Sequence, residues 1–72
     1  SEILDYQLGK VRETLDQYRH AKGRKIVFIH GKGEGVLRNA LLKEIRDKYK
    51  NCSCQDASFR EYGFGATMVT VH

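Results

Sequence analysis

Proline is absent from this sequence, and no run of apolar residues is long enough to cross a membrane. Nothing near the first residue has the charged and apolar regions of a signal peptide. No repeat or low-complexity linker interrupts residues 1–72, so we expect a single domain with a small core. We expect the protein in the cytoplasm. Because the chain begins at Ser1 rather than at methionine, we expect it to be a C-terminal or internal fragment of a longer protein.

Cysteine is also scarce, since Cys52 and Cys54 are the only two and one residue separates them. A disulfide across a single intervening residue would be strained, and two cysteines do not make a disulfide framework. No second cluster completes a zinc site, so the residues predict no metal site. We expect two reduced, structural thiols in an intracellular protein.

Acidic residues are outnumbered, with 9 Asp and Glu against 13 Lys and Arg and a net charge of +4. This balance favours a polyanionic partner such as nucleic acid. The alternative is a protein-interaction module whose basic charge is incidental. An interaction that does not respond to salt would indicate that alternative.

Apolar residues recur at helical spacing in two segments. They predict one helix over residues 2–20, ended by Gly23, and a second over residues 36–49. The apolar stripes consist of Leu4, Leu8, Val11, Leu15 and Tyr18 in the first helix and of Leu37, Leu41, Ile45 and Tyr49 in the second.

Three other segments have the character of strands. Residues 25–29 are apolar after Lys25 and predict an interior, parallel strand; residues 52–59 predict a weaker, polar one; residues 66–71 are β-branched and predict the last. The order α-β-α-β-β indicates an α/β class with a two-layer α+β sandwich. A helix that feeds a parallel strand normally follows an earlier strand, so we expect a strand upstream of Ser1. An exposed sheet edge there would invite self-association.

A glycine-rich turn joins the first predicted strand to the second helix. Gly31, Gly33 and Gly35 let the backbone approach a ligand, and the first N–H groups of a helix have no internal partner. No Ser, Thr, Asp or Asn stands at the helix N-cap, so the helix start is open to an external anion. The segment lacks the ending of a Walker loop and the full dinucleotide-binding pattern. A phosphodiester is therefore the expected partner.

Three basic side chains belong to this turn and helix start. His30 is the candidate catalytic residue, because a histidine beside an open helix start suits phosphate chemistry; the alternative is a structural histidine bonded to loop backbone. Lys32 and Arg38 are expected to point toward the same anion, and Arg60 is a weaker candidate.

Gly63 and Gly65 mark a second glycine turn, which leads through Ala66 to Thr67 in the last predicted strand. We expect this turn to share one basic, nucleic-acid-binding face with the His30 turn. Tyr62 and Phe64 flank it, where they would either stack on unpaired bases or be partly buried loop aromatics.

These motifs resemble the small MutS-related (Smr) domain family. The resemblance rests on His30-Gly31-Lys32-Gly33, then Leu37-Arg38, then Gly63-Phe64-Gly65-Ala66-Thr67, and it covers residues 5–72. It implies a β-α-β-α-β-β fold similar to the C-terminal domain of translation initiation factor three. It also implies nuclease or nucleic-acid-binding activity on DNA or RNA, and it leaves open a divalent metal in the intact nuclease.

The family's LDxH motif on its first strand has no full counterpart in this sequence. Leu4-Asp5-Tyr6-Gln7 shares two letters, but Gln7 replaces the histidine and the segment lies on the first predicted helix. We interpret this match as a coincidence and expect the motif itself upstream of this fragment. We therefore expect the parent protein to be an Smr-type endonuclease that hydrolyses phosphodiesters, and we expect no cleavage by this fragment alone. The alternative function is a non-catalytic nucleic-acid-binding or protein-interaction module.

Overall fold

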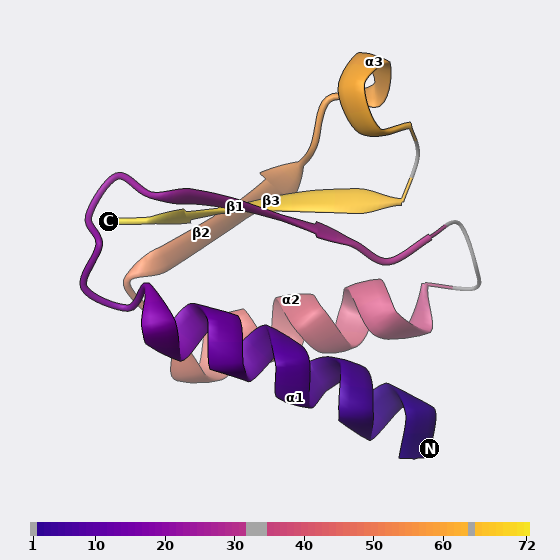
Figure 1. Cartoon of the computed structure of the whole chain (residues 1–72), viewed down its shortest axis with the longest axis horizontal. Helices are drawn as coiled ribbons and strands as arrows, with labels where there is room; N and C mark the ends of the chain where they lie inside the picture. Colours follow the sequence, from indigo (N-terminus) through magenta and orange to yellow (C-terminus); the bar gives the residue numbers. More distant parts are fainter. Residues whose placement is uncertain (1, 32–34, 64) are drawn as a thin grey trace.

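A computed structural model describes residues 2–31, 35–63 and 65–72. The two long helices cover one face of a sheet, and neither covers the opposite face (Figure 1). This is the predicted two-layer α+β class. The elements in chain order are α1 (Glu2–Gln17), β1 (Lys25–Ile29), α2 (Val36–Lys48), β2 (Cys52–Asp56), α3 (Phe59–Tyr62) and β3 (Ala66–Val71).

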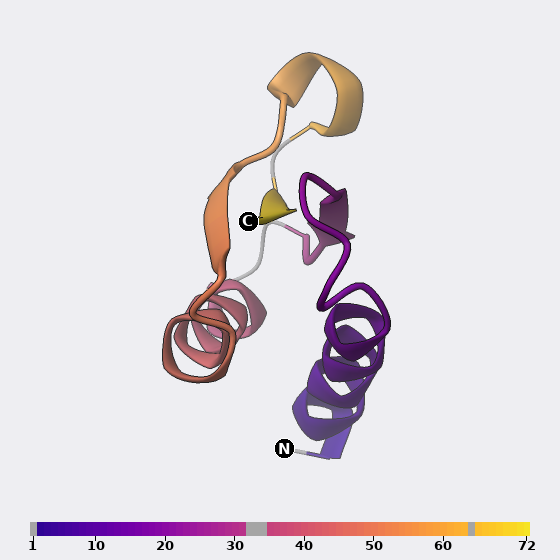
Figure 2. The ribbon, with the colours of Figure 1, turned by 90° about the vertical axis from the view of Figure 1, so that its left-hand side faces the viewer.

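The sheet has the strand order β1-β3-β2, and β3 pairs antiparallel with both neighbours. A view turned by 90° places α1 below β1 and α2 below β2 (Figure 2). The prediction of an interior, parallel β1 is wrong, because β1 pairs only with β3 within the described part of the chain and the pairing is antiparallel. A short apolar run does not distinguish these cases, since a strand covered by helices on one face reads much the same.

The outer edge of β1 carries no strand among the described residues, and Ile29 at its end is 71% exposed. A strand upstream of Ser1 and self-association through a sheet edge both stay predictions.

The core lies between the helices and the sheet. Each long helix contributes one apolar stripe, as the helical spacing predicts, and β3 contributes its helix-facing side chains. Burial is nearly complete at the centre, where Leu15, Leu41 and Val69 are at most 1% exposed. The core cluster consists of Val11, Leu15, Leu41, Ile45, Tyr49 and Val69, with Ile26, Phe28, Cys52 and Cys54 packed against it.

Cys52 and Cys54 are free and half-buried, and both face this core from β2. Burial raises the pKa of both thiols, because the interior disfavours the thiolate. Their surroundings fit the prediction of reduced, structural cysteines.

Two boundaries differ from the prediction. α1 ends at Gln17 rather than near residue 20, and Gly23, at φ +86°, instead ends the connection into β1, where its N–H donates to the Val71 carbonyl at 2.7 Å. The expected strand over residues 52–59 ends at Asp56, and α3 takes the place of its last residue. The register with β3 ends at Asp56, and one further hydrogen bond follows it, from the Ala57 N–H to the Ala66 carbonyl at 3.0 Å.

Candidate nucleic-acid interface

The two glycine turns meet directly at one end of the sheet. The Gly65 carbonyl accepts hydrogen bonds from the N–H of His30 at 2.7 Å and from the N–H of Gly31 at 3.0 Å. Gly65 has φ +87°, and a Cβ built on it would lie 2.4 Å from the Gly31 carbonyl carbon and oxygen. Glycine is therefore required at position 65 both by conformation and by the close approach of the two backbones.

The His30 side chain is bonded at both ring nitrogens. Its Nε2 lies 2.8 Å from the Thr67 hydroxyl oxygen, and its Nδ1 lies 3.2 Å from the Gly31 carbonyl oxygen. A carbonyl only accepts, so Nδ1 carries a proton, and in the neutral ring Nε2 accepts from the Thr67 hydroxyl. Thr67 is 1% exposed. Thr67 therefore contacts the imidazole from the interior of the domain and is shielded from a ligand.

The start of α2 faces the same end of the sheet. Its N-cap is Gly35 at φ +82°, with no side-chain cap and no acidic residue in the first turn. The Asn39 N–H donates to the carbonyl of the N-cap, Gly35, at 2.8 Å, and this is the first hydrogen bond within the helix. The N–H groups before it have no intrahelical acceptor, which leaves positive partial charge at this end of the helix.

Arg38 projects from this first turn, and its guanidinium is already paired. Nη2 lies 3.1 Å from Oδ1 of Asp56 at the end of β2, and both side chains are exposed, by 41% and 77% respectively. Sequence reasoning placed Arg38 near the anion but did not find Asp56 beside it. An exposed pair of this kind contributes little to stability, so a phosphate can compete for the arginine at small cost.

The structure describes only some of the remaining predicted residues. Gly63 has φ +71° and follows α3 directly, and Arg60 is exposed on α3. Lys32 and Gly33 lie outside the described residues, as does Phe64. The side chains of Phe59 and Tyr62 are likewise outside the described part.

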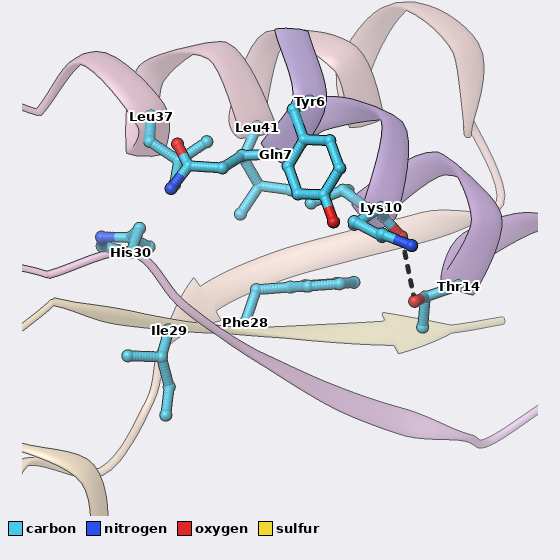
Figure 3. A pocket seen from close by; sticks show the side chains of 10 residues that line it. Tyr6, Gln7, Lys10, Thr14, Phe28, Ile29, His30, Leu37 and Leu41 are labelled. Atoms are coloured by element: carbon cyan, nitrogen blue, oxygen red, sulfur yellow. Dashed lines mark hydrogen bonds between the residues drawn. The ribbon is translucent and has the colours of Figure 1, made fainter. Parts of the chain in front are cut away.

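A hollow of about 250 Å³ opens beside His30, between α1, β1 and α2 (Figure 3). Gln7 and His30 point into it from α1 and from the end of β1, and the Tyr6 ring lies above Lys10, whose Nζ is 5.6 Å from the ring centroid. Gln7 belongs to the segment Leu4-Asp5-Tyr6-Gln7, which is helical as predicted. Its proximity to His30 could not be read from the helical spacing. The lining residues are Tyr6, Gln7, Lys10, Val11, Thr14, Phe28, Ile29, His30, Leu37 and Leu41.

No group of three or more His, Cys, Asp or Glu side chains in the described part of the chain is placed to hold a metal ion. None of the helices in the same residues is long and apolar enough to span a membrane.

The fold and the joined turns define a small two-layer α+β domain with a backbone-built surface at one end of its sheet. The family model described as Smr domain matches this chain over residues 5–72. The chain belongs to the Smr domain family.

Two curated relatives carry the name Endonuclease MutS2. The protein from Caldanaerobacter subterraneus subsp. tengcongensis is 33% identical over 69 residues, which cover 96% of this chain and 9% of the relative. The protein from Finegoldia magna is 37% identical over 46 residues, or 64% of this chain and 6% of the relative. The chain therefore spans only a small part of the length of either relative. No solved structure matches it.

Proposed function

We propose that this Smr domain binds the phosphodiester backbone of DNA or RNA at the surface where its two glycine turns meet. The observation that carries the proposal is the Gly65 carbonyl, which ties the His30 turn to the Gly63–Thr67 turn beside the uncapped start of α2. A phosphate there is recognised by backbone N–H groups and by cations, without contact to bases. Binding is therefore largely independent of sequence and sensitive to salt.

Each residue of the surface has a proposed role. Gly31, Gly33 and Gly35 give close backbone approach, Gly63 and Gly65 shape the facing turn, and the cations Lys32, Arg38 and Arg60 contact phosphates. Arg38 exchanges Asp56 for a phosphate when it binds. Thr67 acts by positioning the His30 ring, since its own side chain is buried.

The test is an NMR titration of the chain with short single- and double-stranded DNA and RNA at low and moderate salt. The proposal expects amide shifts centred on Gly31, the first turn of α2 and Gly63–Thr67, and these shifts weaken as salt rises. The four probes also identify the preferred nucleic acid. If no probe shifts these amides at low salt, the proposal is wrong for this chain.

We further propose that the parent protein hydrolyses phosphodiesters and that His30 serves there as an acid–base or phosphate-contacting group. The names of the two relatives support this. The competing function is a non-catalytic binding module, which is favoured by the lack of a complete LDxH motif in this chain and by a His30 ring whose two nitrogens are already bonded. Cleavage of plasmid DNA and of structured RNA by the full-length parent, compared with its His30→Ala variant, separates the two. Nuclease activity that survives this substitution excludes His30 from the chemistry.

A further inference from the structure

We call the surface where the two glycine turns meet the start of α2 the His30 surface. Far from it, residues 19–25, which lead from α1 into the first residue of β1, concentrate positive charge. They include Arg19, Lys22, Arg24 and Lys25, all of them exposed, and the chain has no acidic residue between Asp16 and Glu34. We call residues 19–25 the basic turn. Figure 1 shows the connection from α1 into β1 at the opposite end of β1 from the connection that leads toward α2.

No ion pair among the described residues includes a member of the basic turn, whereas several cations elsewhere on the surface are paired. Lys10 pairs with Glu13, and Arg46 pairs with Asp47. Asp16, the acid nearest in sequence, instead accepts a hydrogen bond from the Tyr49 hydroxyl at 2.8 Å. The field of the basic turn is therefore not neutralised by neighbouring carboxylates in the described part of the chain, and it attracts anions.

The two arginines of the turn each lie near an aromatic ring. The Arg24 guanidinium lies 4.4 Å from the centroid of the Tyr18 ring, and the Arg19 guanidinium lies 5.7 Å from that of Tyr49. The backbone is tied to β3 by bonds from Gly23 N–H to the Val71 carbonyl at 2.7 Å and from Val71 N–H to the Arg24 carbonyl at 2.9 Å. Charges fixed in this way lose less entropy on binding than those on a loose loop.

We infer that the basic turn is a second phosphate-contact region, so that one nucleic acid strand or duplex bridges it and the His30 surface. This inference rests on the proposed function and adds the distance that a bound nucleic acid must span. Residues 26–29 of β1 lie between the two regions, so the five steps from Lys25 to His30, at about 3.3 Å each, span roughly 17 Å. That length equals the rise of about five base pairs along the axis of a duplex, at about 3.4 Å each. A linear polyanion meets both regions, which favours nucleic acid over an acidic protein or an anionic bilayer.

The experiment measures affinity for a 16-base-pair DNA and the matching RNA duplex between 50 and 200 mM salt. It compares the unaltered chain with Lys22→Gln/Lys25→Gln and with the control Lys43→Gln/Lys50→Gln, which removes the same charge from exposed positions on and after α2. Amide spectra verify that each variant keeps the fold.

We expect the basic-turn variant to lower the slope of log affinity against log salt by about two, because each duplex phosphate contact contributes about 0.9. Its loss of affinity between 50 and 200 mM salt is then smaller by about tenfold, while the control changes the slope by less than half a unit. Equal slopes for the two variants overturn the inference.

A third variant, Arg38→Gln, separates the inference from the proposed function. If it lowers the slope while Lys22→Gln/Lys25→Gln behaves like the control, the His30 surface binds nucleic acid and the basic turn does not. If the unaltered chain binds neither duplex at 50 mM salt, the inference falls, and the NMR titration with single strands decides the proposed function. Binding to phosphatidylserine vesicles that is lost in the basic-turn variant would then assign the turn to a bilayer.

Discussion

At the scale of single residues, the candidate site depends on two close contacts made by small groups. Gly65 allows the backbones of both turns to share one carbonyl, and Thr67 places a hydroxyl under the His30 ring. Neither contact needs a charged side chain. The turn geometry is therefore sensitive to single methyl groups and single hydroxyl groups.

Gly65→Ala is expected to destabilise the chain by more than Gly23→Ala does. Both glycines have φ near +86°, so each substitution costs about 1–2 kcal/mol of backbone strain. Only at Gly65 would the new Cβ also meet backbone, at 2.4 Å from Gly31, whereas nothing lies within 4 Å of a Cβ at Gly23. Urea unfolding of the two variants measures the difference. Equal midpoints would show that the turns separate at no cost.

Thr67→Val is expected to change the His30 tautomer. In the unaltered chain the neutral ring carries its proton on Nδ1, because Nδ1 faces the Gly31 carbonyl and Nε2 faces the Thr67 hydroxyl. Without the hydroxyl, Nε2 faces a methyl group and loses its donor, so the preference for the Nδ1–H form weakens and stability falls by about 1 kcal/mol. Ring ¹⁵N shifts measure the tautomers, with Thr67→Ser as the control that keeps the hydroxyl. An unaltered chain with its proton on Nε2 would contradict this assignment.

At the scale of elements, polar contacts fix how α1, α2 and β2 sit against one another. Glu44 on α2 is buried and accepts hydrogen bonds from Arg12 on α1 and Lys48 one turn later. Tyr49 bonds to Asp16 on α1, and burial together with that bond raises its pKa to about 12. These pairs orient the helices, while Arg38 and Asp56 join α2 to β2 at the candidate site.

Glu44 makes the stability of the domain depend on acid pH. The Arg12 hydrogen bond lowers its pKa in the folded chain below the ordinary value of 4.5. The unfolded chain therefore binds this proton more readily, and the stabilisation present above about pH 4.5 is lost as pH falls through the folded pKa. Glu44→Gln is expected to flatten this part of the stability profile, measured by urea unfolding from pH 7 to pH 3. The control is Glu13→Gln, whose partner Lys10 is exposed. Equal effects of the two variants would contradict the assignment.

Asp56→Asn is expected to increase nucleic-acid affinity by several fold, because it frees Arg38 and removes a negative charge beside the site. The matched control, Asp47→Asn, makes the same charge change beside Arg46 near the other end of α2 and should increase affinity less. Fluorescence anisotropy with a labelled duplex measures both. An identical gain in the two variants would show that only net charge matters.

At the scale of the whole molecule, a small core supports a chain whose charge is unevenly distributed. A domain of 72 residues buries a limited share of its surface, so few side chains carry most of the stability. The ion pairs lie along the helices and at the end of β2, whereas the basic turn has none within the described residues. Both ends of β1 therefore face solvent with groups suited to anions.

Leu15→Ala is expected to cost about 2–5 kcal/mol, since Leu15 is 1% exposed in the central cluster and its truncation leaves a cavity. That is a large part of the stability of a domain this small. Ile3→Ala is the control on the same helix, where the side chain is 73% exposed and the expected change is below about 0.5 kcal/mol. Urea midpoints report both, and a small effect of Leu15→Ala would contradict the proposed position of the core.

Helical spacing predicted both long helices and their buried faces well, because a stripe such as Leu8, Val11 and Leu15 is a local property. The motif resemblance correctly identified the Smr family, and the prediction of Gly35 as an uncapped helix start is confirmed. α3 was missed because a single helical turn has too few residues to show a period.

Local sequence was enough to predict both long helices, the three strands, the family and the residue types gathered in the glycine turns, because these depend on neighbours along the chain. Tertiary structure alone decided that β1 pairs antiparallel with β3, that Gly65 meets Gly31, and that Arg38 meets Asp56. These contacts join residues distant in sequence, and the side-chain period that reveals a strand is the same whichever partner and direction it takes. The open face of the sheet and the separation of the two basic regions follow from that pairing.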